Sequence, residues 1–173
     1  KPTGVELGEG ARVVVMPDRR GVSKSLVSRL EKRGVEAFVI DGTPSTEALA
    51  AQLEAWMGEG PIQGVYWLPA LDREASIAEL SAADWEKAIQ RRSKLLYTAM
   101  RALYDHVSGP GTFLVAGTRL GGKHGFDESG AIAPLGGGSN PAASDAISEG
   151  NCRSGKRTAT ISTKTTTTIG IRT

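Results

Sequence analysis

Short apolar runs alternate with longer amphipathic stretches between residues 11 and 137. Each run holds a few consecutive Val, Ile, Phe, Tyr or Trp residues, which is typical of a strand covered on both faces of a sheet. The runs that predict strands cover residues 13–16, 35–40, 64–68 and 112–116. Strands that alternate with helices in this way predict βαβ units, which wind right-handed into a parallel sheet.

The stretches between these runs carry apolar residues at helical spacing. Gly34 is placed to end the first helix, which we expect over residues 22–33. Ser45 and Ser81 stand where N-caps are expected for the second and third helical regions. The apolar residues that share a stripe in the first helix are Val22, Leu26 and Leu30, and the buried face expected in the second is Leu49, Leu53 and Trp56. In the third helical region the residues that recur at helical spacing are Trp85, Ile89, Leu96, Met100, Leu103 and Val107.

The predicted fold class is therefore α/β, with a Rossmann-like, doubly wound parallel sheet in three layers that is truncated. Residues 11–137 are expected to form this domain, and the polar, Gly-rich residues 1–10 a linker. Residues 138–173 contain no Leu, Val or aromatic residue, and eight of these 36 residues are Thr. We expect this segment to be a tail that is disordered or non-native, because it offers little to a core.

Composition and net charge exclude some classes of function for this chain. A net charge of +2 does not suggest nucleic acid or an anionic membrane as a partner, and no apolar run approaches the roughly 20 residues of a membrane span. Cys152 is the only cysteine, so no internal disulfide can form and a cytoplasmic location is expected. The two histidines are far from this cysteine in sequence, so no metal site is predicted.

The turn after the first strand is where Rossmann folds bind phosphate. A T-G-x-x-x-G-x-G run there lets the backbone approach the pyrophosphate, which lies on the helix N-terminus. If Met16 takes the Thr position, Pro17, Gly21 and Ser23 stand where the three glycines are expected. Pro17 has no N–H to donate. Gly21 is a candidate cofactor-binding residue as a remnant of this turn, and the alternative is a plain tight-turn glycine.

Three other positions are candidates for chemistry. Asp41 ends the second strand, where an acidic residue can bind an adenosine ribose, although Asp-Gly is also an ordinary turn. Thr118 follows the fourth strand as a candidate catalytic hydroxyl, and the alternative is a hydroxyl bonded to nearby backbone. His106 is expected to be solvated near a helix C-terminus. The three tryptophans, Trp56, Trp67 and Trp85, are expected in the core or at an interface.

Three stretches carry a family resemblance. The first is the strand–turn–helix unit that ends in EKRG at residues 31–34. The second is VYWLPALD at residues 65–72, followed by IAEL at 77–80 and DW at 84–85. The third is FLVAGT at residues 113–118, with APLG at 133–136. In order and spacing they resemble the short-chain dehydrogenase/reductase superfamily and, more narrowly, the ketoreductase region of type I polyketide and fatty-acid synthases.

Ketoreductases of that kind have two similar halves, a structural one that has lost the cofactor site and a catalytic one that binds NADPH. This chain looks like the structural half because its glycine turn is degraded. The interval from that turn to the strand at 65–68 is about 45–50 residues, which leaves room for two helices and one strand. A catalytic half carries one more strand–helix unit there, and an Ala-Ala-Gly type turn in place of VYWLPALD.

The family's chemistry gives a sharper test. Reduction needs a Tyr as proton donor, a Lys four residues later that lowers its pKa, and a Ser or Thr that orients the carbonyl. Thr118 falls at the Ser position, and Arg92 falls where the family normally has Asn or Lys. The tyrosines of this chain all precede Thr118, and no Tyr-x-x-x-Lys motif occurs; they are Tyr66, Tyr97 and Tyr104.

The resemblance implies a structural subdomain that binds no cofactor itself, within a parent enzyme that uses NADPH to reduce β-ketoacyl thioesters. Its partners would be the catalytic half, other synthase domains and the acyl carrier protein. Two alternatives stay open. The chain is a truncated, divergent short-chain reductase with its own NAD(P) site at Gly21, Asp41 and Thr118, or it is an unrelated α/β binding domain.

Overall fold

A computed structural model describes residues 5–75, 79–118, 126–127 and 130–131 of this chain. The tail predicted at 138–173 and the APLG stretch at 133–136 lie outside the described residues. Residues 5–10, expected to be a linker, contact the domain: Val5 and Leu7 pack against a buried cluster, and the Gly10 N–H donates to the Gly34 carbonyl at 2.8 Å.

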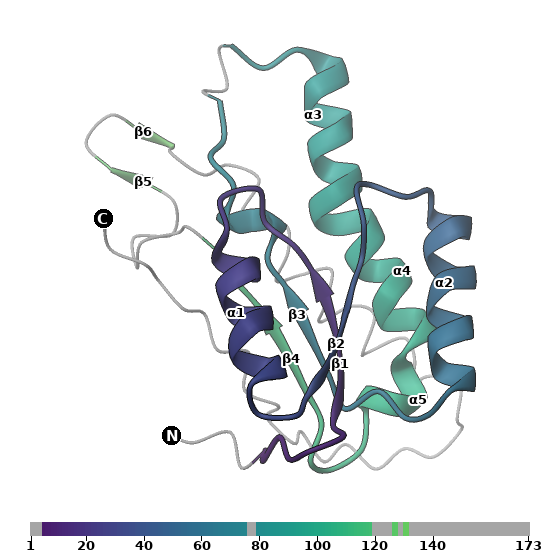
Figure 1. Ribbon diagram of the computed structural model, residues 1–173. Coiled ribbons are helices and arrows are strands. Elements are labelled where there is room, and N and C mark those ends of the chain that lie inside the picture. The colour runs from purple at the N-terminus through teal and green to yellow at the C-terminus, as the bar shows by residue number, and fades with distance from the viewer. Residues whose placement is uncertain (1–4, 76–78, 119–125, 128–129, 132–173) are drawn as a thin grey trace.

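Four parallel strands form the sheet, in the order β2-β1-β3-β4 (Figure 1). They are β1 (Arg12–Met16), β2 (Glu36–Val39), β3 (Gly64–Trp67) and β4 (Phe113–Ala116). The strand order reverses direction after β2, which is the doubly wound arrangement. The predicted α/β, Rossmann-like fold is therefore confirmed. A separate antiparallel pair consists of β5 (Phe126–Asp127) and β6 (Gly130–Ala131).

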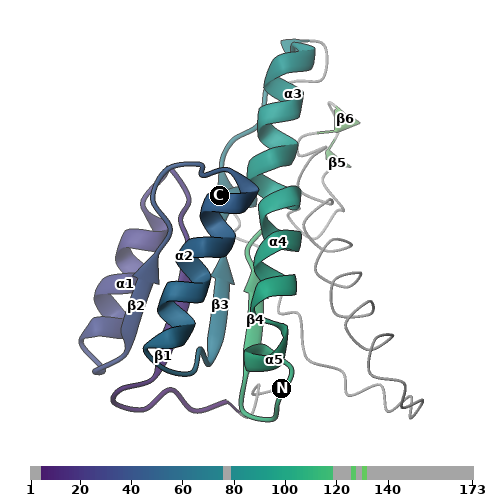
Figure 2. The same ribbon diagram turned by 90° about the vertical axis from the view of Figure 1, so that its right-hand side faces the viewer.

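Helices cover both faces of the sheet and complete the three layers (Figure 2). α1 (Val22–Glu31) lies on one face, and α2 (Thr46–Gly58) and α4 (Leu95–Ala102) lie on the other. The remaining helical elements are the 3₁₀ turn η1 (Pro69–Leu71), α3 (Ala82–Ile89), the π-helical turn η3 (Gln90–Lys94) and α5 (Tyr104–Val107). α3 projects beyond the end of the sheet (Figure 1), and none of its residues is buried.

The alternation of β1 side chains divides the core in two. Val13 and Val15 face α1 and pack in one cluster with Leu30. Val14 and Met16 face the opposite side and pack in the other cluster, which holds Leu49, Leu53, Leu96, Met100 and Leu103. Because β1 is buried on both faces, its residues Val13–Met16 form a continuous apolar run without polar alternation.

Both predicted N-caps are confirmed. The Ser45 hydroxyl accepts from the Ala48 N–H at 3.1 Å and starts α2. The Ser81 hydroxyl accepts from the Asp84 N–H at 3.1 Å and starts α3. These bonds satisfy amides that have no partner inside the helix, so they fix where each helix begins.

The helix predicted after Ser81 is present, and Trp85 lies on it. Trp85 is 39% exposed, so of its two predicted placements, core or interface, the core is wrong. Trp85 is exposed because α3 projects beyond the end of the sheet (Figure 1), and the π-helical turn η3 separates α3 from α4. The Trp67 indole N–H donates to the Arg92 carbonyl in that turn at 3.0 Å, so a core residue supports the irregularity.

His106 also differs from its predicted solvated position. The Ile62 N–H donates to His106 Nδ1 at 3.1 Å, which joins α5 to the segment that enters β3. The imidazole is only half exposed, and it accepts through a nitrogen that carries no proton in this bond.

Gly64 lies against an aromatic side chain and gives a test of this packing. A Cβ at Gly64 would overlap the ring of Phe113, whereas a Cβ at Gly58 would meet nothing within 4 Å. Overpacking costs about 1–3 kcal/mol, so we expect Gly64→Ala to lower the free energy of unfolding by about that amount. Gly58→Ala, the matched control at the end of α2, should leave it unchanged or raise it by about 0.5–1 kcal/mol. Equal stabilities in urea denaturation would show that the ring does not rest on Gly64.

Candidate functional site

The turn between β1 and α1 is closed around the side chain of Asp18. Asp18 Oδ1 accepts from the Ser23 N–H at 2.7 Å, and Oδ2 accepts from the N–H groups of Arg20 at 3.0 Å and Val22 at 3.1 Å. Only 7% of this residue is exposed. These amides lie at the N-terminus of α1, where unpaired N–H groups and the helix dipole favour an anion. The carboxylate of Asp18 is therefore the anion bound at this helix terminus.

The pKa of Asp18 reflects two opposing effects. Burial alone raises the pKa, because it disfavours the charged form. Hydrogen bonds from Ser23, Val22 and Arg20 together outweigh burial and hold the pKa below its ordinary value. The group is thus ionised throughout the physiological range, and the turn depends on its charge.

A second carboxylate, which follows η1 in the chain, also accepts from an amide of this turn. Asp72, which follows η1, accepts from the Arg19 N–H at 2.7 Å and is only 9% exposed. Gly21 lies between the two bonded segments with φ 96°, a left-handed conformation that favours glycine. The N–H groups of the turn at Arg19, Arg20, Val22 and Ser23 therefore all donate to carboxylates of this chain.

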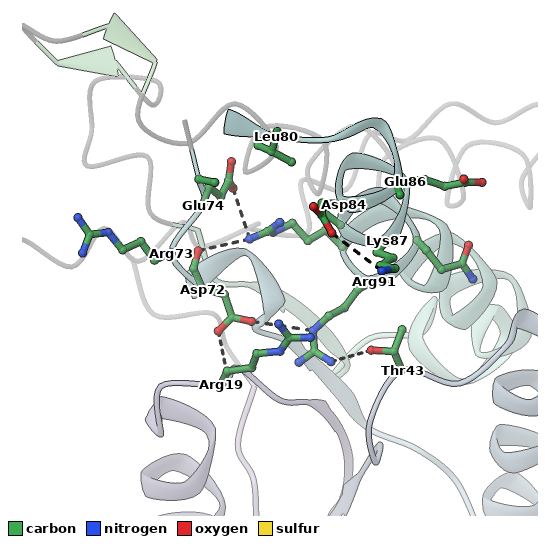
Figure 3. Close-up of a pocket in the computed structure, with 15 residues that line it drawn as sticks. Arg19, Thr43, Asp72, Arg73, Glu74, Leu80, Asp84, Glu86, Lys87 and Arg91 are labelled. Atoms are coloured by element: carbon green, nitrogen blue, oxygen red, sulfur yellow. Dashed lines mark hydrogen bonds and ion pairs between the residues drawn. The ribbon is translucent and has the colours of Figure 1, made fainter. Parts of the chain in front are cut away.

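Arg91 joins the carboxyl ends of three strands. Its guanidinium donates to the Pro17 carbonyl at 2.7 Å, after β1, and to the Gly42 carbonyl at 2.8 Å, after β2. It also donates to the Thr43 hydroxyl at 3.1 Å, and its Nε lies 3.9 Å from the Asp72 carboxylate (Figure 3). Burial, followed by the charge of Arg19, lowers the pKa of Arg91 from its ordinary value.

Arg92 faces the loop after β3. This arginine is 7% exposed, and its guanidinium lies 3.4 Å from the Asp72 carbonyl oxygen and 3.7 Å from the Glu74 carboxylate. In this structure the side chain holds the loop at residues 72–74 against the long helix.

A cavity of about 740 Å³ opens above these groups, between the loop at 72–75 and α3 (Figure 3). Its lining carries charges of both signs. The charged lining residues are Arg19, Arg73, Lys87, Arg91 and Arg92 on the basic side and Asp72, Glu74, Asp84 and Glu86 on the acidic side. The near balance of charge gives no strong preference for an anionic dinucleotide.

The three predicted site residues occupy separate positions. Gly21 is in the turn around Asp18, and a Cβ there would meet nothing within 4 Å. Asp41 is exposed after β2 and precedes Gly42, whose φ of 58° marks the ordinary Asp-Gly turn. Thr118 is fully buried after β4, and its hydroxyl has no hydrogen-bond partner among the described residues. The backbone partner expected for that hydroxyl is therefore not found there.

Sequence reasoning did not identify three residues that join the loops at the carboxyl edge of the sheet, namely Asp18, Asp72 and Arg91. A signal for Asp18 was present, because Pro-Asp after a strand favours an Asx-type turn whose side chain bonds the following amides. No comparable local signal exists for Arg91, whose hydrogen-bond partners lie 48 to 74 residues away in sequence. Within the described residues, no group of three or more His, Cys, Asp or Glu side chains is placed to hold a metal ion, and no helix is long and apolar enough to cross a bilayer.

Comparisons with known proteins bear on the fold. A scan against protein-family models gives no match, and neither does a search of curated proteins. Among solved structures, the Bacillus cereus enoyl-acyl carrier protein reductase with NADP+ and indole naphthyridinone is similar, with a TM-score of 0.62 and 16% identity over 86% of this chain and 70% of that one. An NADH-dependent reductase responsible for alginate metabolism has a TM-score of 0.61 and 10% identity over 84% of this chain and 74% of that one.

A short-chain dehydrogenase/reductase from Serratia marcescens is also similar, with a TM-score of 0.59 and 13% identity over 84% of this chain and 68% of that one. At such low identity these likenesses establish the fold. The chain has a Rossmann-like α/β fold that is similar to the folds of these reductases.

The Asp18 carboxylate should contribute stability that depends on pH. Asp18→Asn offers one acceptor oxygen in place of two and turns an N–H₂ group toward amide donors, so we expect a loss of about 1–3 kcal/mol at pH 7. Because the folded-state pKa is lowered, the contribution is present above the unfolded-state value of about 3.9 and is lost as pH falls through the folded-state pKa. The gap between wild type and variant should therefore close in acid. Urea denaturation from pH 7 to pH 2 measures it, with exposed Asp41→Asn as the control; a gap that stays constant with pH contradicts the assignment.

Proposed function

We propose that this chain is the structural, non-catalytic subdomain of a synthase β-ketoacyl reductase. In this role it supports an adjacent catalytic half that reduces carrier-bound β-ketoacyl thioesters with NADPH in the cytoplasm. The segment itself binds no dinucleotide. The observation that carries the proposal is the Asp18 carboxylate, which accepts from three amides at the N-terminus of α1.

Those amides are the groups that would hold a pyrophosphate in a dinucleotide-binding Rossmann fold. A phosphate must first displace a buried carboxylate from three hydrogen bonds, each worth about 1.5–3 kcal/mol because the acceptor is charged. Together these bonds are comparable with the whole binding free energy of a micromolar ligand, about 8 kcal/mol. Repulsion between the phosphate and the nearby carboxylate adds to this cost.

Arg91, at the carboxyl ends of β1 and β2, also supports the proposal that the segment binds no dinucleotide. A dinucleotide in this fold crosses from the turn after β1 toward the end of β2, where an acidic residue can bind the ribose. The Arg91 guanidinium bonds the Pro17 and Gly42 carbonyls, which follow these two strands. The side chain thus bridges the path that the adenosine ribose would take, whereas Asp41 is exposed after β2.

The residues at the family's catalytic positions also support a structural, non-catalytic role for this chain. Thr118 stands at the end of β4, and this residue is fully buried. The chain holds no Tyr-x-x-x-Lys motif, so it lacks the proton donor of the family that it resembles. Reduction would therefore depend on the catalytic half.

Calorimetric titration with NADPH and with pyrophosphate tests this proposal. We expect no heat from the wild-type chain at millimolar ligand, on protein shown to be folded by circular dichroism. Asp18→Gly removes the carboxylate and frees the three amides, so this variant should bind pyrophosphate measurably while Asp41→Gly, the exposed control, does not. Saturable one-to-one binding of NADPH to the wild type would instead indicate a truncated reductase with a working phosphate turn.

A further inference from the structure

Strand β2 is one edge of the four-stranded sheet and pairs only with β1 among the strands that the structure describes (Figure 2). In the strand order of dinucleotide-binding Rossmann folds, a further strand pairs with the outer side of the second strand. This chain passes instead from β2 through α2 to β3, which lies on the other side of β1. Within the described part of the chain, the position beyond β2 is therefore open to another strand.

The hydrogen bonds of β2 to β1 show which of its backbone groups point outward. The N–H groups of Glu36 and Ile40 donate to carbonyls of the β1 segment at 2.8 Å and 3.0 Å. Backbone groups of successive residues in a strand point to opposite sides within the plane of the sheet. The N–H and C=O groups of Ala37 and Val39 therefore point away from β1. Such a row of backbone groups is a template for pairing with another chain.

The side chains along this edge indicate the chemistry of the strand that fits it. Val39 is 41% exposed, more than any other large apolar side chain that the structure describes. Glu36 and Asp41, at the two ends of the edge, are both exposed. At about 3.3 Å per residue, their backbones lie about 16 Å apart. An extended segment with an apolar centre and a basic residue at each end complements this edge in shape and in charge.

We propose that the outer edge of β2 binds an extended segment of a partner protein by strand addition. The backbone groups of Ala37 and Val39 bond the segment, and an apolar side chain of the segment covers Val39. Two Lys or Arg residues of the segment, about five positions apart, pair with Glu36 and Asp41. Pairing of two β2 edges would bring the carboxylates of both copies together, which disfavours a second copy of this chain as the occupant. The inference does not rest on the proposed function.

An NMR titration of the isotope-labelled chain tests the inference. The probe is a blocked synthetic peptide with the sequence Lys-Thr-Val-Thr-Val-Lys, whose two lysines match the spacing of the two carboxylates. We expect the amide resonances of Ala37 and Val39 to shift saturably, because these groups gain hydrogen-bond partners. A control peptide with Glu in place of both lysines should bind about tenfold more weakly, since it places like charges opposite one another.

Variants of β2 locate the binding site. Val39→Pro removes an outward N–H but no bond to β1, and proline is tolerated at such positions of edge strands; it should raise the dissociation constant at least tenfold. Glu36→Gln combined with Asp41→Asn tests the charges without touching the backbone and should raise the constant about twofold to tenfold. The matched control Glu54→Gln, exposed on α2, should change it less than twofold. Thermal unfolding verifies the fold of each variant.

Three results would overturn the inference. The first is a titration in which the amides of Ala37 and Val39 do not shift, or in which the variants of β2 leave the dissociation constant unchanged. The second is the absence of saturable binding at millimolar peptide. The third comes from hydrogen exchange without peptide: protection of both amides at every protein concentration assigns the edge to the chain's own residues, and protection that grows with concentration assigns it to a second copy.

Discussion

The bonds between the Asp18 carboxylate and the amides of Arg20, Val22 and Ser23 fix the carboxyl edge of the sheet. They set the direction of α1, because they hold its first turn against the end of β1. They also supply the negative charge that the helix N-terminus favours. In dinucleotide-binding Rossmann folds, the N-terminus of this helix binds an external phosphate. In this chain it binds the Asp18 carboxylate. The amides at this helix N-terminus therefore already have an anionic partner within the chain.

Two arginines make further contacts among the loops at the carboxyl edge of the sheet. The π-helical turn η3 places two consecutive arginines toward the sheet, whereas neighbours in an α-helix of 3.6 residues per turn point about 100° apart. Arg91 bridges the ends of β1 and β2, and Arg92 contacts the loop after β3. A buried guanidinium with carbonyl partners is costly to unpair, so this bridge resists displacement. The loops at the carboxyl edge of the sheet are thus joined to one another by these two arginines.

Much of the fold was predictable because it depends on local pattern. Apolar runs gave the four strands to within one or two residues, and the capping serines at 45 and 81 located the starts of α2 and α3. The candidate site was not predictable to the same degree. Gly21 was recognised as a turn residue, but the role of Asp18 depends on which amides its carboxylate meets after folding. The position of Arg91 depends on η3, which Trp67 supports from a distant strand, and no periodicity of the helix itself indicates it.

The most direct test of the central claim is a pH titration of the Ser23 and Val22 amides by heteronuclear NMR. A carboxylate that accepts from these N–H groups changes their chemical shifts when it is protonated. The account predicts that both amides shift together, with a midpoint below the ordinary aspartate value of about 3.9, and that Asp18→Asn abolishes the transition. Amides that do not respond to acid, or that titrate at the ordinary value, would contradict the claim that Asp18 occupies the phosphate turn.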